Sequence, residues 1–383
     1  MKSKLTFVRA AWILVALLTH RAWAQSAAAP PSPPRLGFKS HYLVDVATDR
    51  VLAVSAPDIA LPPASLTKLM TAYIVFDAVA TGRIRLDDRV RVSEKAWRMG
   101  GTRMFIEVNS EVAVEDLIRG MLIQSGNDAS VALAEHIAGS VEGFVAEMNA
   151  TALSLGMQSS AFRNPHGLPA RGHYSTARDL ALLATAIIRD FPEFYGLYAE
   201  REFSYNGIAQ HNRNALLWRD PSVDGMKTGY TDAAGYCLVT SAERDGMRLI
   251  AVVMGAPSAR LRNDGAQRLL DYGFANFETH KVYSAGQELE AARVWGGERE
   301  YTGLGLAEDI YVTIPRGAYE KLAASMDVVA ELAAPLVRGT TVGEVRISFG
   351  GEQLAKSPLI VLTNVMDGGV WARMRDELSS IWE

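Results

Sequence analysis

Three short polar motifs, far apart along the chain of 383 residues, contain the side chains best suited to nucleophilic catalysis. Ser65 and Lys68 form a Ser-x-x-Lys motif, Ser125-Gly-Asn127 follows, and Lys227-Thr-Gly229 comes last. A serine hydroxyl needs an adjacent base to take its proton near neutral pH. A lysine three residues further along a helix lies on the same face, and burial or a nearby cation can keep it neutral. The spacing therefore predicts a serine nucleophile with a lysine base, on a helix begun by the two preceding prolines.

Each motif is weak when taken singly, because Ser and Lys are common in the first turn of a helix. Ser-x-x-Lys and Lys-Thr-Gly nevertheless occur once each in this chain. Their order, with Ser-x-Asn between them, is that of the penicillin-recognising serine enzymes, in which the three motifs converge on one cleft. The combination favours an acyl-transfer site over three unrelated structural segments.

The sequence resembles the D-alanyl-D-alanine carboxypeptidases, the low-molecular-mass penicillin-binding proteins that trim peptidoglycan stem peptides in the bacterial periplasm. The likeness is collinear over most of the chain. It includes residues 42–45, 65–68, 123–129, 164–168, 174–179, 212–218, 223–232 and 273–279. The resemblance implies an α+β fold, in which a β-lactamase/transpeptidase-like domain has an antiparallel sheet flanked by helices.

The resemblance also implies a reaction. Ser65 attacks the carbonyl between the last two D-alanines, D-alanine leaves, and water hydrolyses the acyl-enzyme. The backbone N–H groups of Ser65 and Tyr230 would hold the developing oxyanion, which needs fixed donors. Ser125 would relay a proton to the leaving amine, and Asn127 would hold the amide on the acyl side. Lys227 would supply positive potential, and penicillins would acylate the same serine.

Substrate binding is implied for the residues around the third motif. Thr228 would bind the C-terminal carboxylate of the substrate, and the neighbouring Gly229 would also contact the substrate. Arg213 and the arginines of Arg260-Leu-Arg262 are candidates for the same carboxylate, since a guanidinium matches a carboxylate in a two-pronged geometry. For either arginine alone, a solvated surface ion pair is an equal alternative.

The residue after Lys-Thr-Gly is Tyr230 in this chain, whereas the close relatives have histidine there. If catalysis uses only the backbone N–H of this residue, the change of side chain does not prevent acylation. It would then alter the fit of the substrate and the rate at which the acyl-enzyme is cleared. His166 and Asp179, both in matching segments, are expected to be structural.

Other functions remain for comparison. A serine β-lactamase shares two motifs, but class A enzymes deacylate with a glutamate, and no Glu-x-x-Leu-Asn lies between Ser125 and Lys227. A non-catalytic wall-binding scaffold would have no physical need for all of the reactive residues. A D,D-endopeptidase acting on peptidoglycan cross-links is a close variant that the sequence does not separate from a carboxypeptidase.

Length and composition agree with an exported two-domain enzyme. A chain of 383 residues is longer than most domains that have a single hydrophobic core, so two domains are expected. The net charge of -4 and the lack of a basic stripe argue against nucleic-acid binding. Cys237 is the single cysteine, which excludes an internal disulfide and predicts a small buried side chain. The seven histidines show no ligand spacing, so no metal or cofactor is expected.

The N-terminal residues have the pattern of a targeting segment. Basic residues precede an apolar stretch, and Ala22-Trp-Ala24 provides small residues for cleavage. Residues 1–24 are therefore predicted to be a secretory signal peptide, and the apolar stretch is too short for a membrane anchor. Residues 25–36, rich in Pro and Ala, read as an extended linker. The predicted location is the periplasm.

The rest of the chain divides into two expected domains. Residues 37–279 would form the catalytic domain, with a hairpin at 41–46 and 51–55, a helix at 114–138 broken near Ser125, and strands at 225–240 and 248–254. From residue 280 to 365, short alternating segments such as 311–315 and 341–348 predict a second, smaller β-rich domain.

The last segment, residues 366–383, is predicted to be an amphipathic helix on the outer face of the cytoplasmic membrane. Its apolar residues recur on one side of a helix about 21 Å long, which is too short to cross the hydrocarbon layer. Those residues are Val370, Trp371, Met374, Leu378, Ile381 and Trp382. The alternative is a helix packed on the second domain, because acidic residues outnumber basic ones and give anionic lipid little attraction.

Overall fold

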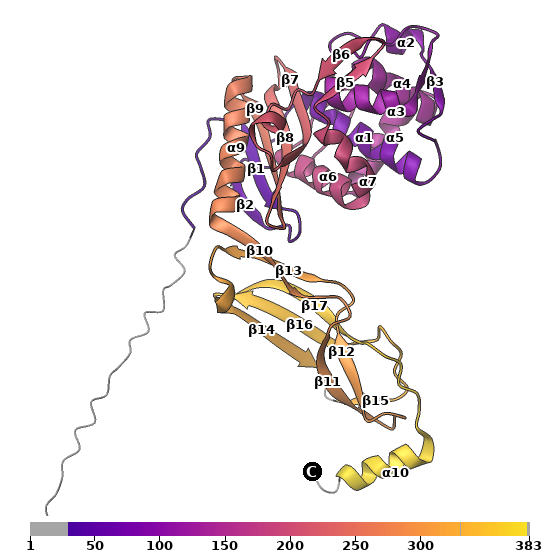
Figure 1. Cartoon of the computed structure of the whole chain (residues 1–383), viewed down its shortest axis with the longest axis vertical. Helices are drawn as coiled ribbons and strands as arrows, with labels where there is room; N and C mark the ends of the chain where they lie inside the picture. The colour runs from indigo at the N-terminus through magenta and orange to yellow at the C-terminus, as the bar shows by residue number, and fades with distance from the viewer. Residues whose placement is uncertain (1–29, 330, 381–383) are drawn as a thin grey trace, which may run out of the picture.

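A five-stranded antiparallel sheet is the framework of the larger lobe in the computed structural model, which describes residues 30–329 and 331–380 (Figure 1). Its strand order is β2-β1-β9-β8-β7, so β7 is an edge strand. The strands are β1 (Ser40–Asp45), β2 (Val51–Ser55), β7 (Val223–Thr231), β8 (Gly235–Arg244) and β9 (Met247–Ala256). The predicted hairpin and the predicted later strands are confirmed. Within the described part of the chain no strand pairs with the outer side of β7, so this edge can pair with another extended chain.

Helices cover both faces of this sheet (Figure 1). The long helix α9 (Ala259–Asn276) packs Leu269, Leu270 and Phe274 on one face. The opposite face meets α6 and the other helices of the lobe. They are α1 (Lys68–Ala80), α2 (Glu94–Trp97), α3 (Val114–Arg119), α4 (Asn127–Ala138), α5 (Val141–Ser154), α6 (Ala177–Asp190), α7 (Pro192–Tyr195) and α8 (Leu216–Arg219). Two small antiparallel sheets border them. One pairs β3 (Arg89–Arg91) with β4 (Glu111–Ala113) across α2, and the other is a hairpin of β5 (Glu202–Tyr205) and β6 (Ile208–His211).

Helix α1 runs through the interior of the helical layer. It has apolar side chains on every side, including the fully buried Leu69, Met70 and Phe76. A helix that is hydrophobic all round is stable only when it is enclosed, and α1 is surrounded by α4, α5 and α6. Its N-terminal end is thereby fixed against the sheet, where β7 contacts the turn that precedes α1.

The smaller lobe consists of β strands, as predicted, and extends away from the sheet at the end of α9 (Figure 1). Strands β10 (Phe277–Tyr283) and β13 (Ile310–Pro315) form a two-stranded sheet. A six-stranded sheet has the order β14-β16-β17-β12-β11-β15. Its strands are β11 (Glu288–Trp295), β12 (Tyr301–Gly305), β14 (Leu322–Val328), β15 (Leu332–Ala333), β16 (Thr341–Phe349) and β17 (Glu352–Val361). Strand β10 spans the expected boundary between residues 279 and 280.

A polar junction connects the two lobes. Thr279 Oγ1 donates a hydrogen bond of 2.7 Å to the buried carboxylate of Asp45, and Arg50 Nη1 donates one of 2.7 Å to the carbonyl of Thr313. Burial raises the pKa of Asp45, while the hydrogen bonds that it accepts oppose the shift. The hairpin of the large lobe is thus tied to the strand that begins the small one.

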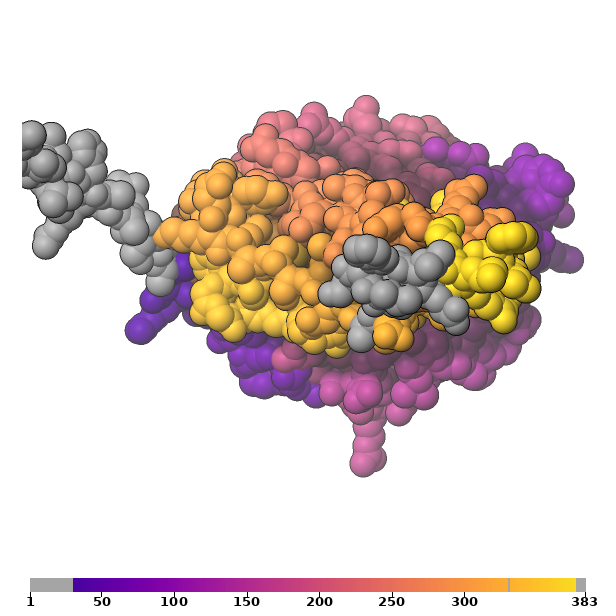
Figure 2. All heavy atoms as spheres, turned by 90° about the horizontal axis from the view of Figure 1, so that it is seen from below, coloured from indigo at the N-terminus to yellow at the C-terminus, as the bar shows by residue number. Residues whose placement is uncertain are grey.

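Helix α10 (Gly369–Ser380) lies at the far end of the small lobe, where it is yellow in Figure 2. The helix predicted for residues 366–383 is observed over Gly369–Ser380. Ala372 and Asp376 are buried, and Asp376 accepts a hydrogen bond of 2.5 Å from the N–H of Gly296. No helix within residues 30–329 and 331–380 is long and apolar enough to cross a membrane. The predicted signal peptide, linker residues 25–29 and the last residues of the predicted anchor lie outside the described residues.

Candidate active site

Ser65 lies in a 3₁₀ turn, Ala64–Thr67, directly before Lys68 begins α1. The turn places Ser65 Oγ 3.2 Å from Lys68 Nζ, which confirms the predicted shared face. Gly167 packs against this turn with a φ of +91°, and a Cβ at this position would lie 1.8 Å from the carbonyl oxygen of Ala64. A glycine is therefore required there for the loop to approach the turn so closely.

Lys68 is completely buried, and its amine has two polar partners besides the serine. Nζ donates to Asn127 Oδ1 at 2.7 Å and to the carbonyl of His166 at 2.6 Å. Burial lowers the pKa of Lys68 well below its ordinary value, and the positive charge of Lys227 lowers it further. A neutral amine that donates both of its hydrogens to these oxygens keeps its lone pair for the Ser65 hydroxyl.

Ser125 occupies the break in the second predicted helix. A π-helical segment, Gly120–Gln124, ends at Ser125, which has a left-handed backbone with φ of +70°, and α4 begins at Asn127. The Ser125 hydroxyl oxygen is buried without a hydrogen-bond partner among the described residues. A strained residue with an unpaired hydroxyl is typical of a functional position.

Asn127 is more involved with Lys68 than the sequence suggested. Besides accepting from Lys68, its Nδ2 donates to the carbonyl of Gly100 at 2.7 Å. The side chain therefore bridges the base and the loop that forms one wall of the site. One hydrogen of the amide group remains for a substrate.

Lys227 is buried below the cavity and its Nζ donates to the carbonyl of Thr228 at 3.1 Å. Burial lowers the pKa of Lys227 to about 7, and the charges of Arg213 and Arg262 add to this shift. Burial also lowers the pKa of Arg262 to about 10, a value at which it stays charged near neutral pH. Arg262 donates from Nε and Nη2 to Asn263 Oδ1 at 3.0 and 2.9 Å, which fixes its guanidinium.

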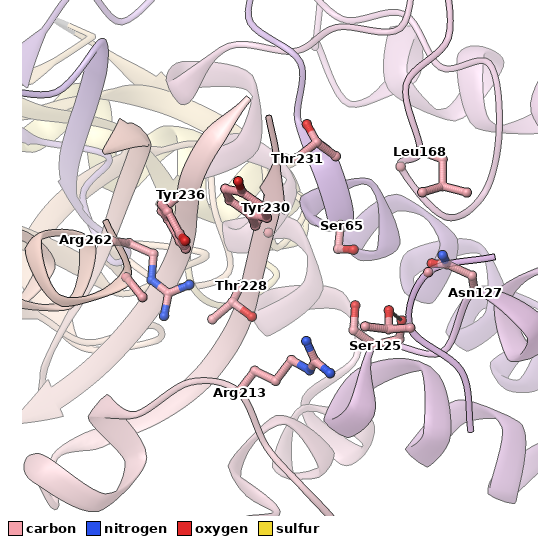
Figure 3. A pocket seen from close by; sticks show the side chains of 15 residues that line it. Ser65, Ser125, Asn127, Leu168, Arg213, Thr228, Tyr230, Thr231, Tyr236 and Arg262 are labelled. Atoms are coloured by element: carbon pink, nitrogen blue, oxygen red, sulfur yellow. Dashed lines mark hydrogen bonds between the residues drawn. The ribbon is translucent and has the colours of Figure 1, made fainter. Parts of the chain in front are cut away.

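One cavity of about 500 Å³ brings most of these residues together (Figure 3). The predicted site residues that line it are Ser65, Ser125, Asn127, Arg213, Thr228, Gly229, Tyr230 and Arg262. Lys68 and Lys227 lie buried behind this lining, and Arg260 does not contribute to it. Sequence reasoning missed the other lining residues, which are Gly101, Thr102, Gly167, Leu168, Thr231, Tyr236 and Ala259. Of these, Gly167, Leu168 and Thr231 had a signal, because they lie in the segments on which the resemblance was based.

Strand β7 borders the nucleophile along its free edge. A Cβ at Gly229 would lie 3.1 Å from the backbone nitrogen of Ser65, so this glycine lets the strand come close to the catalytic turn. Tyr230 follows with a half-exposed ring, whose centroid is 4.3 Å from that of Tyr236. Its hydroxyl donates to Asp232 Oδ1 at 2.7 Å.

Comparison with known proteins decides the family. The profile described as D-alanyl-D-alanine carboxypeptidase, of the peptidase S11 family, matches residues 26–258, which is more than half of the chain. The chain belongs to the D-alanyl-D-alanine carboxypeptidase family. The profile of the C-terminal domain of penicillin-binding protein 5 matches residues 277–367 of this carboxypeptidase. The lobe after α9 is therefore similar to that domain.

Relatives of this carboxypeptidase match it over most of its length. The D-alanyl-D-alanine carboxypeptidase DacC of Escherichia coli is 44% identical over 351 residues, which are 90% of this chain and 88% of DacC. Among solved structures, penicillin-binding protein 5 from Haemophilus influenzae has 42% sequence identity and a TM-score of 0.83. The match covers 88% of this chain and 99% of the Haemophilus chain.

Penicillin-binding protein D2 of Listeria monocytogenes, solved in its ampicillin-bound form, has 32% sequence identity and a TM-score of 0.59. The match covers 64% of this chain and 100% of the Listeria chain.

The remaining polar residues of this serine carboxypeptidase have structural partners. His166 is neutral because burial lowers its pKa to about 3, and its Nδ1 accepts from the N–H of Leu168 at 3.1 Å. Asp179 accepts from the N–H of Ser159 at 2.9 Å and from the hydroxyl of Ser160 at 2.7 Å. Cys237 is a buried free thiol, as predicted. Within the described residues, no cluster of His, Cys, Asp or Glu is arranged to hold a metal ion.

Proposed function

We propose that this carboxypeptidase removes the terminal D-alanine of a peptidoglycan stem pentapeptide through an acyl-enzyme on Ser65, with Lys68 as the base. The supporting observation is the 3.2 Å contact between Ser65 Oγ and Lys68 Nζ, whose other two partners are oxygens. The Ser65 proton moves to Lys68 Nζ while Oγ bonds to the carbonyl carbon. The C–N bond then breaks, the amine takes up a proton relayed by Ser125, and D-alanine leaves. Water hydrolyses the ester and restores Ser65.

The proposed substrate lies as an extended chain along the free edge of β7. Its C-terminal carboxylate meets Thr228 and the guanidinium groups of Arg213 and Arg262, which line one end of the cavity. Its reacting carbonyl oxygen points to the backbone N–H groups of Ser65 and Tyr230. A carboxylate next to two guanidiniums forms strong, oriented hydrogen bonds. The leaving D-alanine is therefore bound by the charge that distinguishes a C-terminal residue from an internal one.

The binding of this carboxylate favours carboxypeptidase over endopeptidase activity. An endopeptidase cleaves a cross-link, in which the D-alanine carbonyl is bonded to a residue of another stem peptide. The leaving group is then larger than D-alanine. Mature protein incubated with a pentapeptide ending in D-Ala-D-Ala should release D-alanine, and incubation with a cross-linked dimer should release much less product. Faster cleavage of the dimer would instead make the endopeptidase the main activity.

Penicillins are proposed to acylate Ser65 in the same position. The Listeria protein whose structure matches this chain was solved with ampicillin bound. A β-lactam presents a strained amide and a carboxylate, which fit the same nucleophile and the same cations as the peptide. A fluorescent penicillin should therefore label the mature protein covalently.

The side chain of Tyr230 is expected to tune turnover without being required for acylation. Its hydroxyl contacts Asp232 and the residue as a whole is half exposed, so Tyr230→Phe should change penicillin acylation by no more than about two- to threefold, as for a surface substitution. Tyr230→His should keep the covalent label and change the rate of D-alanine release. The measurements are stopped-flow acylation and steady-state release. Loss of acylation in a folded Tyr230→Phe protein would show that the phenol is essential.

The proposed location is the periplasm, with the protein on the outer face of the inner membrane. Support comes from the sequence of residues 1–24, which has the pattern of a signal peptide, and from a cell-wall substrate. The α10 helix supports peripheral attachment, since Val370, Trp371 and Met374 are exposed together while Ala372 and Asp376 face the small lobe. An exposed tryptophan beside other apolar side chains suits the headgroup region of a bilayer.

Removal of residues 370–383 should release the mature protein from membranes and leave D-alanine release unchanged. The matched variant Trp371→Asp/Met374→Asp keeps the contacts of Ala372 and Asp376 and should release the protein equally. Co-sedimentation with vesicles of mixed zwitterionic and anionic lipids measures the effect. If both proteins still sediment like the unaltered one, or if the truncated lobe unfolds, α10 is a packed structural helix and the anchor proposal fails.

A further inference from the structure

A second cavity adjoins the one that contains Ser65, and none of the three sequence motifs lines it. Its volume is about 310 Å³, and it shares Gly167 and Thr231 with the Ser65 cavity. Pro62, just before the catalytic turn, forms another part of its wall. Because the two cavities have two residues in common, a chain bound in the first can continue into the second.

The direction of the bound peptide decides which part of it faces the second cavity. The carboxylate end is held near Thr228 and Arg213, and β7 runs from there past Ser65 to its last residue, Thr231. Figure 3 shows Thr231 and Leu168 on the opposite side of Ser65 from Arg213. An extended chain advances about 3.3 Å per residue, so the span from Thr228 to Thr231 corresponds to about 10 Å. The residue before the two D-alanines therefore comes to the mouth of the second cavity.

The lining of the second cavity is suited to an anion. Among the described residues that line it, Arg171 has the only side chain with a permanent positive charge, and none has an acidic side chain. Arg171 is exposed and makes no hydrogen bond or ion pair with any residue that the structure describes. The other titratable lining residue, His173, remains neutral because burial lowers its pKa to about 4. The guanidinium of Arg171 is thus available to a ligand.

The turn that carries Arg171 is fixed relative to the nucleophile. The N–H of His173 closes the turn by donating to the carbonyl of Ala170 at 3.1 Å. His173 Nδ1 accepts from the N–H of Arg163 at 2.9 Å, so the ring proton is on Nε2, which donates to Thr67 Oγ1 at 2.8 Å. Thr67 belongs to the same 3₁₀ turn as the nucleophile. The wall of the second cavity is therefore anchored to the catalytic turn.

We propose that Arg171 forms an anion subsite on the acyl side of the reacting bond. The subsite binds a carboxylate on the side chain of the residue that precedes the D-Ala-D-Ala end of the peptide. This inference rests on the proposed function and adds a substrate preference to it: Arg171 is a specificity residue that contacts the substrate away from the reacting atoms.

Two matched tripeptides test the subsite. Both end in D-Ala-D-Ala and begin with an acetylated 2-aminoheptanedioic acid, which has a free side-chain carboxylate in one peptide and a carboxamide in the other. The unaltered protein should prefer the carboxylate peptide in kcat/KM by about fivefold, the effect of a partly solvated ion pair. Arg171→Ala should remove this preference, Arg171→Glu should reverse it, and 0.5 M salt should weaken it.

Arg163→Ala is the matched control. Arg163 is an exposed arginine beside the same turn, and it does not line the second cavity. Its removal changes the net charge equally and should leave the preference intact, because only its backbone N–H holds His173. Two outcomes would rule out the subsite and leave the proposed function standing. One is equal kcat/KM for the two peptides with the unaltered protein, and the other is a preference that persists in Arg171→Ala. Failure of the unaltered protein to release D-alanine from either peptide would overturn the proposed function as well.

Discussion

Ser65→Ala should abolish penicillin labelling and reduce D-alanine release by about 10⁴-fold or more, the usual effect of losing a catalytic nucleophile. Among the residues that the structure describes, Ser65 provides the only hydroxyl oxygen within hydrogen-bonding distance of Lys68 Nζ. The other two oxygens belong to an amide side chain and a backbone carbonyl, neither of which can form an ester. Because the hydroxyl makes no further side-chain hydrogen bond among the described residues, the substitution should leave the fold intact.

Peptide mapping of the labelled protein gives the decisive measurement. The adduct should be found on the peptide that contains Ser65, and the thermal unfolding temperature of Ser65→Ala should match that of the unaltered protein. Ser125→Ala is the comparison variant, because Ser125 lines the same cavity and its hydroxyl is buried without a partner among the described residues. It should keep the label and lose turnover. An adduct on Ser125 with Ser65 free would contradict the mechanism.

The local parts of this site could be predicted from the sequence because the residues concerned are close together along the chain. Ser65 and Lys68 are three positions apart, so the geometry of one helical turn fixes their distance. The break at Ser125 could be predicted because Gly126 interrupts an apolar helical pattern. The β-rich second lobe followed from alternation of apolar residues, which reports directly on strands.

The tertiary parts of the site could not be predicted in this way. The link from Lys68 to the carbonyl of His166 joins residues 98 positions apart, and the link to Asn127 joins residues 59 apart. A backbone carbonyl has no sequence signal, and the resemblance suggested a substrate contact for Asn127, not a contact with the base. Tyr236 was missed because its place beside Tyr230 depends on the register of β7 and β8. Such contacts depend on packing, which residue spacing does not specify.

Lys68→Gln should reduce acylation by about 10²- to 10⁴-fold, the range expected for a general base. Glutamine keeps an N–H donor for Asn127 Oδ1 or the carbonyl of His166, whereas a purely apolar residue would leave both buried oxygens unpaired at a cost of about 1–3 kcal/mol each. The amide nitrogen cannot accept the serine proton. Acylation should therefore fail in a protein that still unfolds cooperatively.

The pH dependence of acylation tests why Lys68 can act as the base. Lys68 must be neutral, so acylation should fall as the pH drops through its depressed pKa and it gains a proton. Lys227 carries its charge below its own pKa of about 7, and this charge lowers the pKa of Lys68. Lys227→Gln should consequently raise the pKa of Lys68 and move the acidic limb of the profile to higher pH. Penicillin acylation rates measured from about pH 4 to about pH 9 would show the shift. An acidic limb that stays in place or moves to lower pH would mean that the charge of Lys227 does not help to keep the base neutral.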